Sequence, residues 1–339
     1  MDEVIEIVAD AVDVSAKCDR GVELAARDQR VRHSPDAVLV ALRHGSLVAR
    51  CSCWWRQTPV LDEYPVGMIG HYAAADRAAA AAVLERACGL LAAEQCRLAI
   101  GPIDGSTWRQ YRFAGEGSLS APFFLEPSHP SHWPADWAAA GFSSVASYAS
   151  AVTDALDARD SGTGEAREVL RNGSIAVRPF DISRADAELH AIFQLLLASF
   201  DRNFLYAPIT EQEFLYDGRA LLPFVQPELT LLGERDGKLV AFLTALPDVL
   251  QAQRGHVVDT VIVKTVAVAP MLSGCGVGGA LVTLAHDRAR RLGFRRAIHA
   301  LMHDSNPSLR ISRRSARVCR RYALLARPTS ASPCRGGVR

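Results

Sequence analysis

The most distinctive chemical feature of the sequence is a glycine cluster between two apolar segments. Residues 266–281 read VAVAPMLSGCGVGGAL, with Gly274, Gly276 and Gly278 two residues apart. Glycines at this spacing let several backbone N–H groups point into one concavity, and the N-terminus of a following helix adds partial positive charge. Such a turn can hold an anion such as a diphosphate. The alternative is a plain flexible turn that binds nothing.

Two familiar phosphate-binding motifs do not fit this segment. A P-loop needs Gly-Lys-Ser or Gly-Lys-Thr after the glycines, and Gly278-Gly279-Ala280 stands there instead. The dinucleotide motif GxGxxG needs a first strand before it and a ribose-binding acid after it, and neither is in place. We therefore expect a diphosphate site of another class.

The glycine cluster lies in a series of expected elements that fills the second half of the chain. The β-branched run before the cluster predicts a buried strand, and Asp236-Gly237 predicts a hairpin turn. Thr210 with Glu213 fits a capping box at a helix start. In chain order we expect strand 175–179, helix 183–200, a helix from 210, hairpin 228–247, strand 259–268, helix 277–292, strand 297–302, helix 306–317 and strand 322–325.

The first half repeats part of this order, which predicts an internal duplication. We expect hairpin 36–55 around His44-Gly45, strand 66–72, helix 78–95, strand 97–100, a short helix ending at 137–141 and strand 145–152. Residues 154–172 are charged and read as a linker or a solvated helix. The expected organisation is a first domain 1–153, a linker 154–173, a second domain 174–327 and a flexible tail 328–339. The fold class is α/β with a mixed sheet.

The strand, glycine loop and helix of the second half resemble the acyl-CoA-binding signature of the GNAT superfamily of N-acyltransferases. In that family a strand L-x-V-x-P leads into R/Q-x-x-G-x-G/A and a helix. Here the strand is Val266-Ala-Val268 with Pro270, and the loop is Ser273-Gly-Cys-Gly-Val-Gly278. The first half resembles the family by element order alone and has no glycine cradle. The resemblance implies two tandem GNAT-like domains, each a central mixed sheet flanked by helices, the first of them degenerate.

The activity that the resemblance implies is transfer of an acetyl group from acetyl-CoA to an amine of a small molecule or peptide by direct attack on the thioester. The N–H of Val268 would polarise the thioester carbonyl. Asn306 would touch the pantetheine arm, and its alternative role is an ordinary helix cap. The implied acetyl-CoA-binding residues are Val266, Val268, Ser273, Gly274, Cys275, Gly276, Val277, Gly278, Gly279 and Asn306.

Two departures from the family pattern concern catalysis. Ser273 stands where the family usually has Arg or Gln, and residues 308–321 contain no tyrosine to serve as general acid. The nearest tyrosine is Tyr322. For the general base we consider Asp259, His256 and Glu234, and we choose Asp259. Because the usual tyrosine is missing, the alternative is a non-catalytic acyl-CoA-binding or scaffold protein of the same fold.

Composition limits the other classes of function. The 38 Lys and Arg nearly balance the 37 Asp and Glu, yet residues 288–339 hold fourteen arginines and one acid. A protein bound to nucleic acid along its whole length would not show this asymmetry. The sequence has no apolar run of membrane-spanning length, no signal pattern and no C-x-x-C pair, which favours a cytoplasmic protein with reduced thiols. An oligomer is compatible with this composition.

Two further groups of residues could serve function but have simpler explanations. The histidines, including the close pair His129 and His132, do not have metal-ligand spacing, so we expect no metal site. Residues 103–134 are rich in aromatic residues and proline. Such a long loop could wall a substrate pocket or cover the seam between the domains, and we favour the seam.

Overall fold

The computed structural model describes residues 5–9, 17–18, 22–61, 63–117, 121–154, 156, 162–306, 309 and 316–329. The helices are α1 (Arg27–His33), α2 (Arg77–Ala93), α3 (Trp133–Ala139), α4 (Thr163–Asn172), α5 (Ala185–Phe200), α6 (Glu211–Leu221), α7 (Leu250–Gln253) and α8 (Val277–Arg291). The strands are β1 (Ile5–Ala9), β2 (Lys17–Cys18), β3 (Ala37–Arg43), β4 (Ser46–Trp54), β5 (Val60–Leu61), β6 (Tyr64–Ala74), β7 (Leu98–Gly101), β8 (Phe113–Gly117), β9 (Ser143–Thr153), β10 (Ala176–Pro179), β11 (Thr230–Arg235), β12 (Lys238–Pro247), β13 (Thr260–Val268), β14 (Arg296–His303) and β15 (Arg317–Pro328).

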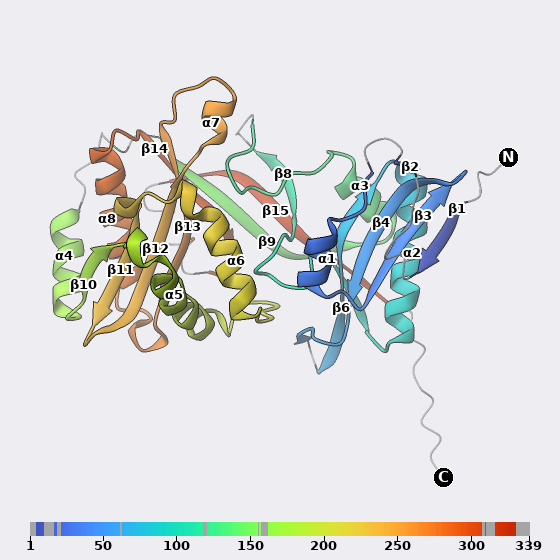
Figure 1. Ribbon diagram of the computed structural model, residues 1–339, viewed down its shortest axis with the longest axis horizontal. Coiled ribbons are helices and arrows are strands. Elements are labelled where there is room, and N and C mark those ends of the chain that lie inside the picture. The colour runs from blue at the N-terminus through green and yellow to red at the C-terminus, as the bar shows by residue number, and fades with distance from the viewer. Residues whose placement is uncertain are drawn as a thin grey trace, which may run out of the picture.

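These strands form one continuous mixed sheet that runs through both halves of the chain. Its order is β1-β3-β4-β6-β7-β15-β9-β14-β13-β12-β11-β10. The last strand of each half is exchanged. Strand β15 pairs with β7 of the first half, and β9 pairs with β14 of the second half, while β9 and β15 pair with each other. Figure 1 shows β9 in green and β15 in red between the two halves.

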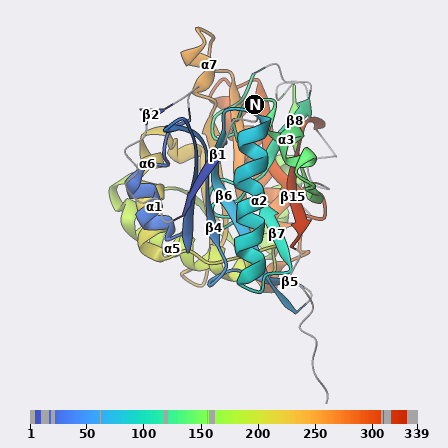
Figure 2. The same ribbon diagram turned by 90° about the vertical axis from the view of Figure 1, so that its right-hand side faces the viewer.

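In the first half, α2 covers one face of the strands (Figure 2). Asp76 starts this helix, because its carboxylate accepts the N–H of Ala79 at 3.0 Å. The apolar side of α2 supplies Val83, Leu84 and Leu91, all fully buried. A Cβ at Gly67 of β6 would lie only 2.6 Å from the Leu91 side chain, so glycine at this position allows helix and strand to pack closely.

The second half builds a similar arrangement around two parallel strands. Strand β13 leads through a turn into α8 and then into β14, which is parallel to β13. Helices α4, α5 and α8 and strands β10 to β13 contribute to one apolar core. Among the described residues, no helix has both the length and the apolar character needed to cross a membrane.

Most of the elements expected from the sequence are confirmed. Both predicted hairpin turns are present, with positive φ at His44 and Gly45 and at Asp236 and Gly237. The charged segment before the second half contains a helix, α4. The expected strand over 322–325 is longer and begins at Arg317.

Other expectations differ from the structure or are not tested by it. Residues 103–134 were expected to form a loop and contain β8. The helix expected over 306–317 falls largely outside the described residues, as does most of the tail 328–339. The division into domains 1–153 and 174–327 stays a prediction, because the sheet is continuous across it.

The loop over residues 103–134 does cover the seam between the halves. The Trp108 ring lies 5.8 to 6.4 Å from four aromatic rings of the second half: Phe193, Phe200, Tyr206 and Phe214. The same loop also reaches the cavity described below, so both of its expected roles apply to different residues. The cysteines Cys51, Cys53, Cys88, Cys96, Cys275 and Cys319 are free thiols.

Candidate functional site

The glycine turn joins β13 to α8 and is exposed to solvent. After a single 3-10 turn, Pro270–Leu272, the backbone has φ of 81° at Gly274 and 80° at Gly276. These values are strained for any residue with a side chain. A Cβ at Gly274 would meet no atom within 4 Å. Backbone conformation, and not close packing, therefore requires glycine there.

The turn presents several unused backbone donors. Within residues 162–306, the N–H groups of Gly274 and of residues 276–279 donate to no backbone acceptor. Helix α8 begins at Val277 without a side-chain cap and is 15 residues long. Free donors and the positive end of the helix thus face the same solvent region. The structure brings residues 273–279, all predicted from the sequence, into one surface suited to a diphosphate.

Strands β13 and β14 separate beside this turn. They pair in parallel only from Thr260–Arg296 to Val263–His299. Beyond that point β13 stays with β12 as far as Val268, whereas β14 follows β9 after an irregular step in which Leu301 has φ of 59°. A gap therefore opens between the two strands, with the second part of β13 along one side.

Backbone donors of β13 face this gap. Ala269 donates its N–H to the carbonyl of Val240 in β12, at 2.8 Å. Because N–H groups alternate along a strand, those of Val266 and Val268 point away from β12 and toward the gap. The Val268 carbonyl accepts the hydroxyl of Ser199 in α5 at 3.2 Å, which fixes the strand at this position.

A β-bulge marks the place where the strands part. Thr244 of β12 faces Thr265, and Ala245 faces Val263, so Lys264 is the extra residue on β13. Bulges re-aim side chains and often occur beside active sites. Here the bulge places the lysine at the entrance of the gap.

A cavity of about 1180 Å³ lies next to the gap and between the two halves. Helices α5 and α6 and strands β12 to β14 form one part of its wall, and residues 107–112 of the first half form another. Of the residues predicted from the sequence, Val266 and Asn306 line it. Val268, Asp259, Tyr322 and residues 273–279 are not among its lining residues. The cavity is thus reached from β13, while the glycine turn lies beyond the strand end.

The structure holds Asp259 in a polar network away from the cavity. Its carboxylate accepts hydrogen bonds from Gln251 at 2.9 Å, from Thr260 at 2.8 Å and from Arg296 at 3.0 Å. Although burial acts in the opposite direction, these hydrogen bonds and the charge of Arg296 lower the pKa of Asp259. A carboxylate in this state is a weak base.

Tyr322 is buried in the middle of the sheet. Its side chain is 2% exposed. The hydroxyl donates to the carboxylate of Glu126 and lies 2.9 Å from the Ser150 hydroxyl. Burial and the nearby Glu126 charge raise the pKa of Tyr322. This geometry ties the tyrosine to residues of the first half, and Tyr322 itself is not among the residues that line the cavity.

The other two base candidates also lie elsewhere. Glu234 forms an ion pair with Arg178 at 2.7 Å, between β10 and β11. His256 is exposed in the segment between α7 and β13. Asn306 lies just after β14, where its N–H donates to the carbonyl of His303 at 2.9 Å.

Sequence reasoning missed three cavity residues. Arg112 is 6% exposed, donates to the Leu301 carbonyl at 3.1 Å and lies 3.7 Å from the Tyr111 ring centroid. Lys264 interrupts an otherwise apolar strand sequence, TVIVKTVAV, which is a signal that could have revealed it. His303 ends β14. For Arg112 we find no comparable sequence signal.

The environment of these groups sets their charge. Burial, and next the charge of Arg112, lowers the pKa of Lys264 to about 8. Burial also lowers the pKa of His303, which favours the neutral form of its ring. Its Nδ1 accepts the N–H of Ser305 at 3.1 Å and lies 2.7 Å from the Ser305 hydroxyl.

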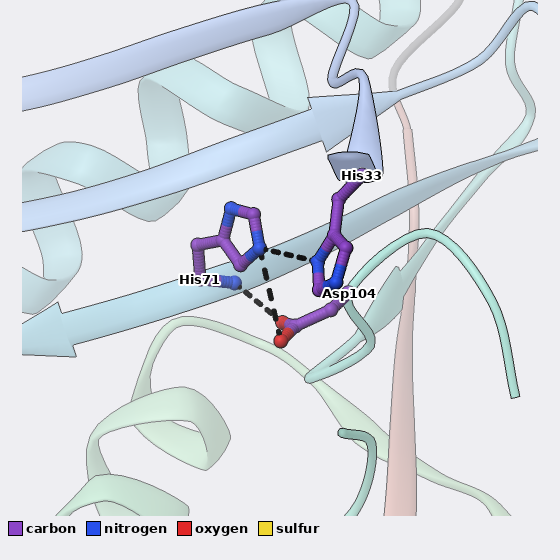
Figure 3. Close-up of side chains that lie close together, drawn as sticks. All are labelled: His33, His71 and Asp104. Carbon is purple, nitrogen blue, oxygen red and sulfur yellow. Dashed lines mark hydrogen bonds and ion pairs between the residues drawn. The ribbon is translucent and has the colours of Figure 1, made fainter. Parts of the chain in front are cut away.

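A separate buried cluster lies in the first half (Figure 3), where His33, His71 and Asp104 bring three ligand atoms within 4.8 Å of one another. A neutral hydrogen-bond chain accounts for both rings. The Ser52 hydroxyl is 3.0 Å from His71 Nδ1, and His71 Nε2 is 2.8 Å from His33 Nδ1. Burial, with smaller contributions from nearby arginines, lowers the pKa of each histidine to about 3. Positive charge opposes a divalent cation, so we assign the cluster a structural role.

Comparisons with known proteins agree with this geometry. Residues 189–313 match the model of the acetyltransferase (GNAT) family. No curated protein sequence matches the chain. A solved structure from Enterococcus faecalis, described as a probable N-acyltransferase of unknown function, aligns with a TM-score of 0.57 at 10% identity, covering 97% of this chain and 73% of that one.

A second similar structure is a GCN5-related glucosamine N-acetyltransferase region of a fungal multi-domain beta-N-acetylglucosaminidase. It aligns with a TM-score of 0.53 at 12% identity. The alignment covers 96% of this chain but only 38% of that longer protein. At sequence identities of 10% and 12%, these similarities establish a shared fold and not a shared function. Residues 189–313 therefore resemble the GNAT family of acetyltransferases, and the chain has the mixed α/β fold of these solved structures.

Proposed function

We propose that the protein is an N-acetyltransferase that transfers an acetyl group from acetyl-CoA to an amine. The observation that carries this proposal is the gap between β13 and β14, which continues to the open glycine turn. A long thioester carrier fits this arrangement, because its diphosphate would meet the donors of the turn while its amide-containing arm would extend along β13.

In this proposal the backbone of β13 positions the donor. The outward N–H groups of Val266 and Val268 would bind the arm and polarise the thioester carbonyl. Asn306 faces the same cavity from the end of β14. Ser273 is exposed at the turn and can add a hydroxyl to the diphosphate site.

We propose His303, with Ser305, as the general base. An ammonium acceptor gives one proton to His303 Nδ1 through the Ser305 hydroxyl. The resulting amine attacks the carbonyl carbon, the C–S bond breaks, and the second amine proton goes to the departing thiolate. A neutral imidazole, which the lowered pKa of His303 provides, is the form required for the first step.

Acetyl-CoA binding tests the donor site directly. Calorimetry should show binding to the unmodified protein and at least roughly tenfold weaker binding to Gly276→Val. Gly293→Val is the matched control, since Gly293 also has a positive φ, 93°, but follows the far end of α8. No heat with acetyl-CoA, or equal weakening in both variants, would contradict the proposed site.

A thiol-release assay with a panel of amines tests the transfer itself. Release of CoA with any amine supports the transferase. Tight acetyl-CoA binding without release across the panel would instead support a non-catalytic acyl-CoA-binding protein, the alternative raised by the absence of the usual tyrosine.

A further inference from the structure

Besides the exposed Arg202, the cavity contains two cations that no described acid neutralises. Lys264 and Arg112 both line it, and the charge of Arg112 acts on Lys264. Within the described part of the chain, neither side chain forms an ion pair, and the Lys264 amine has no hydrogen-bond acceptor. The groups whose charge favours the cationic form of Arg112 are tyrosines.

The acids that line the cavity face other partners. Glu126 forms an ion pair with Arg320 at 2.8 Å. Asp28 lies 3.5 Å from Arg32 in the next turn of α1. Asp217 of α6 also faces Arg32. The cavity near the bulge is therefore positive and uncompensated.

The two cations stand on opposite sides of the gap. Lys264 occupies the bulge of β13, whereas Arg112 donates to the Leu301 carbonyl on β14. Keeping both charged and largely out of water costs free energy, and an anion bound between them would offset this cost. Arg112 belongs to the first half, so that half contributes to the site of the second.

The proposed donor does not supply this anion. Its diphosphate would lie at the glycine turn, and its arm and acetyl group are uncharged. The remaining source is the acceptor. The wall of the cavity is largely apolar, with side chains from β12, α5 and α6 that include Phe242, Ile192, Leu196 and Phe214.

We infer that the acceptor is an amino acid with an apolar side chain, whose carboxylate binds Lys264 and Arg112. This inference rests on the transferase function proposed above. It selects among amine acceptors, because polycationic amines such as aminoglycosides would be repelled by the same two residues.

Binding of reaction products tests the inference without turnover. N-acetyl-L-leucine and N-acetyl-L-phenylalanine, with their carboxamides as matched neutral ligands, are titrated calorimetrically into the protein with and without CoA. We expect each acid to bind at least about tenfold more tightly than its amide. Equal or weaker binding of the acids would overturn the inference, and this comparison in the unmodified protein needs no variant.

Variants then assign the selectivity to the two residues. In Lys264→Met and Arg112→Met, the ratio of the dissociation constant of the amide to that of the acid should fall toward one. Arg202→Gln is the control, because Arg202 also lines the cavity but is exposed. If Lys264→Met weakens acid and amide equally, the lysine does not bind the carboxylate, and the inference is wrong.

The two proposals fail separately. Loss of acetyl-CoA binding or of thiol release counts against the transferase. Failure to distinguish acids from amides counts against the amino acid acceptor, even where CoA is bound and released normally.

Discussion

Arg109 of the first half and Glu213 of the second half form a bidentate ion pair, with Nε 2.6 Å from Oε1 and Nη2 2.9 Å from Oε2. The two side chains are only 11% and 5% exposed. Arg109 precedes Arg112 in the loop of the first half, and Glu213 lies in the first turn of α6. The Thr210 side chain caps this turn at the Glu213 N–H, but the Glu213 carboxylate binds Arg109 and does not complete the expected capping box.

We expect Glu213→Ala to lower the free energy of unfolding by about 3 kcal/mol, because Arg109 would remain buried without its counterion. Urea denaturation measures this change. The control is Asp186→Ala, which removes the exposed pair with Arg219 between α5 and α6 and should change stability little. Similar decreases in the free energy of unfolding of both variants would mean that burial does not strengthen the contribution of the Arg109–Glu213 ion pair to stability.

The proposed base predicts a pH dependence for acetyl transfer. His303 acts in its neutral form, so kcat/KM should rise with pH until the ring has lost its proton. Because burial lowers the pKa of His303 from 6.5, the midpoint of this rise should lie below pH 6.5. His303→Gln should abolish the rise together with most of the activity, whereas an unchanged profile would exclude His303 as the base.

Asp304 offers a finer test of the same group. Its charge raises the pKa of His303. Asp304→Asn should therefore move the midpoint to lower pH, by a modest amount because this carboxylate is partly exposed. The measurement is the pH profile of kcat/KM, supported by NMR titration of the His303 ring. A shift to higher pH would contradict this assignment.

Local signals were enough to predict the turns. The pairs His44-Gly45 and Asp236-Gly237 adopt positive φ as expected, and Gly274 and Gly276 do so in the proposed diphosphate turn. These outcomes depend on residues adjacent in the sequence. For the same reason, the strand before the turn and the helix after it were also predicted correctly.

Long-range pairing could not be read in the same way. The residues of β9 and β15 favour strands, but a strand's own sequence does not determine which strand it pairs with. Their exchange is what places Arg112 beside Leu301, a residue 189 positions later in the chain. The positive part of the cavity is therefore a product of topology, which the sequence pattern of either half alone does not contain.

Two buried histidines predict how stability depends on pH. The Nε2 atoms of His286 in α8 and His299 in β14 lie 2.9 Å apart. Burial lowers the pKa of His286 to about 4 and that of His299 to about 3. The unfolded chain binds protons on them below about pH 6.5. It therefore carries more protons than the folded chain between pH 6.5 and pH 3, and the free energy of unfolding falls as the pH falls through this range.

Replacing one histidine should reduce this acid sensitivity. Each buried histidine contributes up to about 1.4 kcal/mol of lost stability per pH unit below 6.5. Urea denaturation between pH 7.5 and 4.5 should show a smaller slope for His299→Asn than for the unmodified protein. The exposed His256→Asn serves as control and should keep the original slope. If His299→Asn also keeps the original slope, the pair of His286 and His299 does not cause the acid sensitivity.

The exchanged strands predict that neither half folds stably alone. Strand β9 pairs with β14 and β15, both from the second half, while β15 pairs with β7 and β8 of the first half as well as with β9. A fragment 1–161 would lack both partners of β9 and would leave one edge of β7 unpaired. Coexpressed with 162–339, it should form a one-to-one complex with restored cooperative unfolding, measured by size-exclusion chromatography and circular dichroism. A fragment 174–327 that unfolds cooperatively and binds acetyl-CoA alone would show instead that β15 can be accommodated within its own half, and that the exchange is not required for the fold.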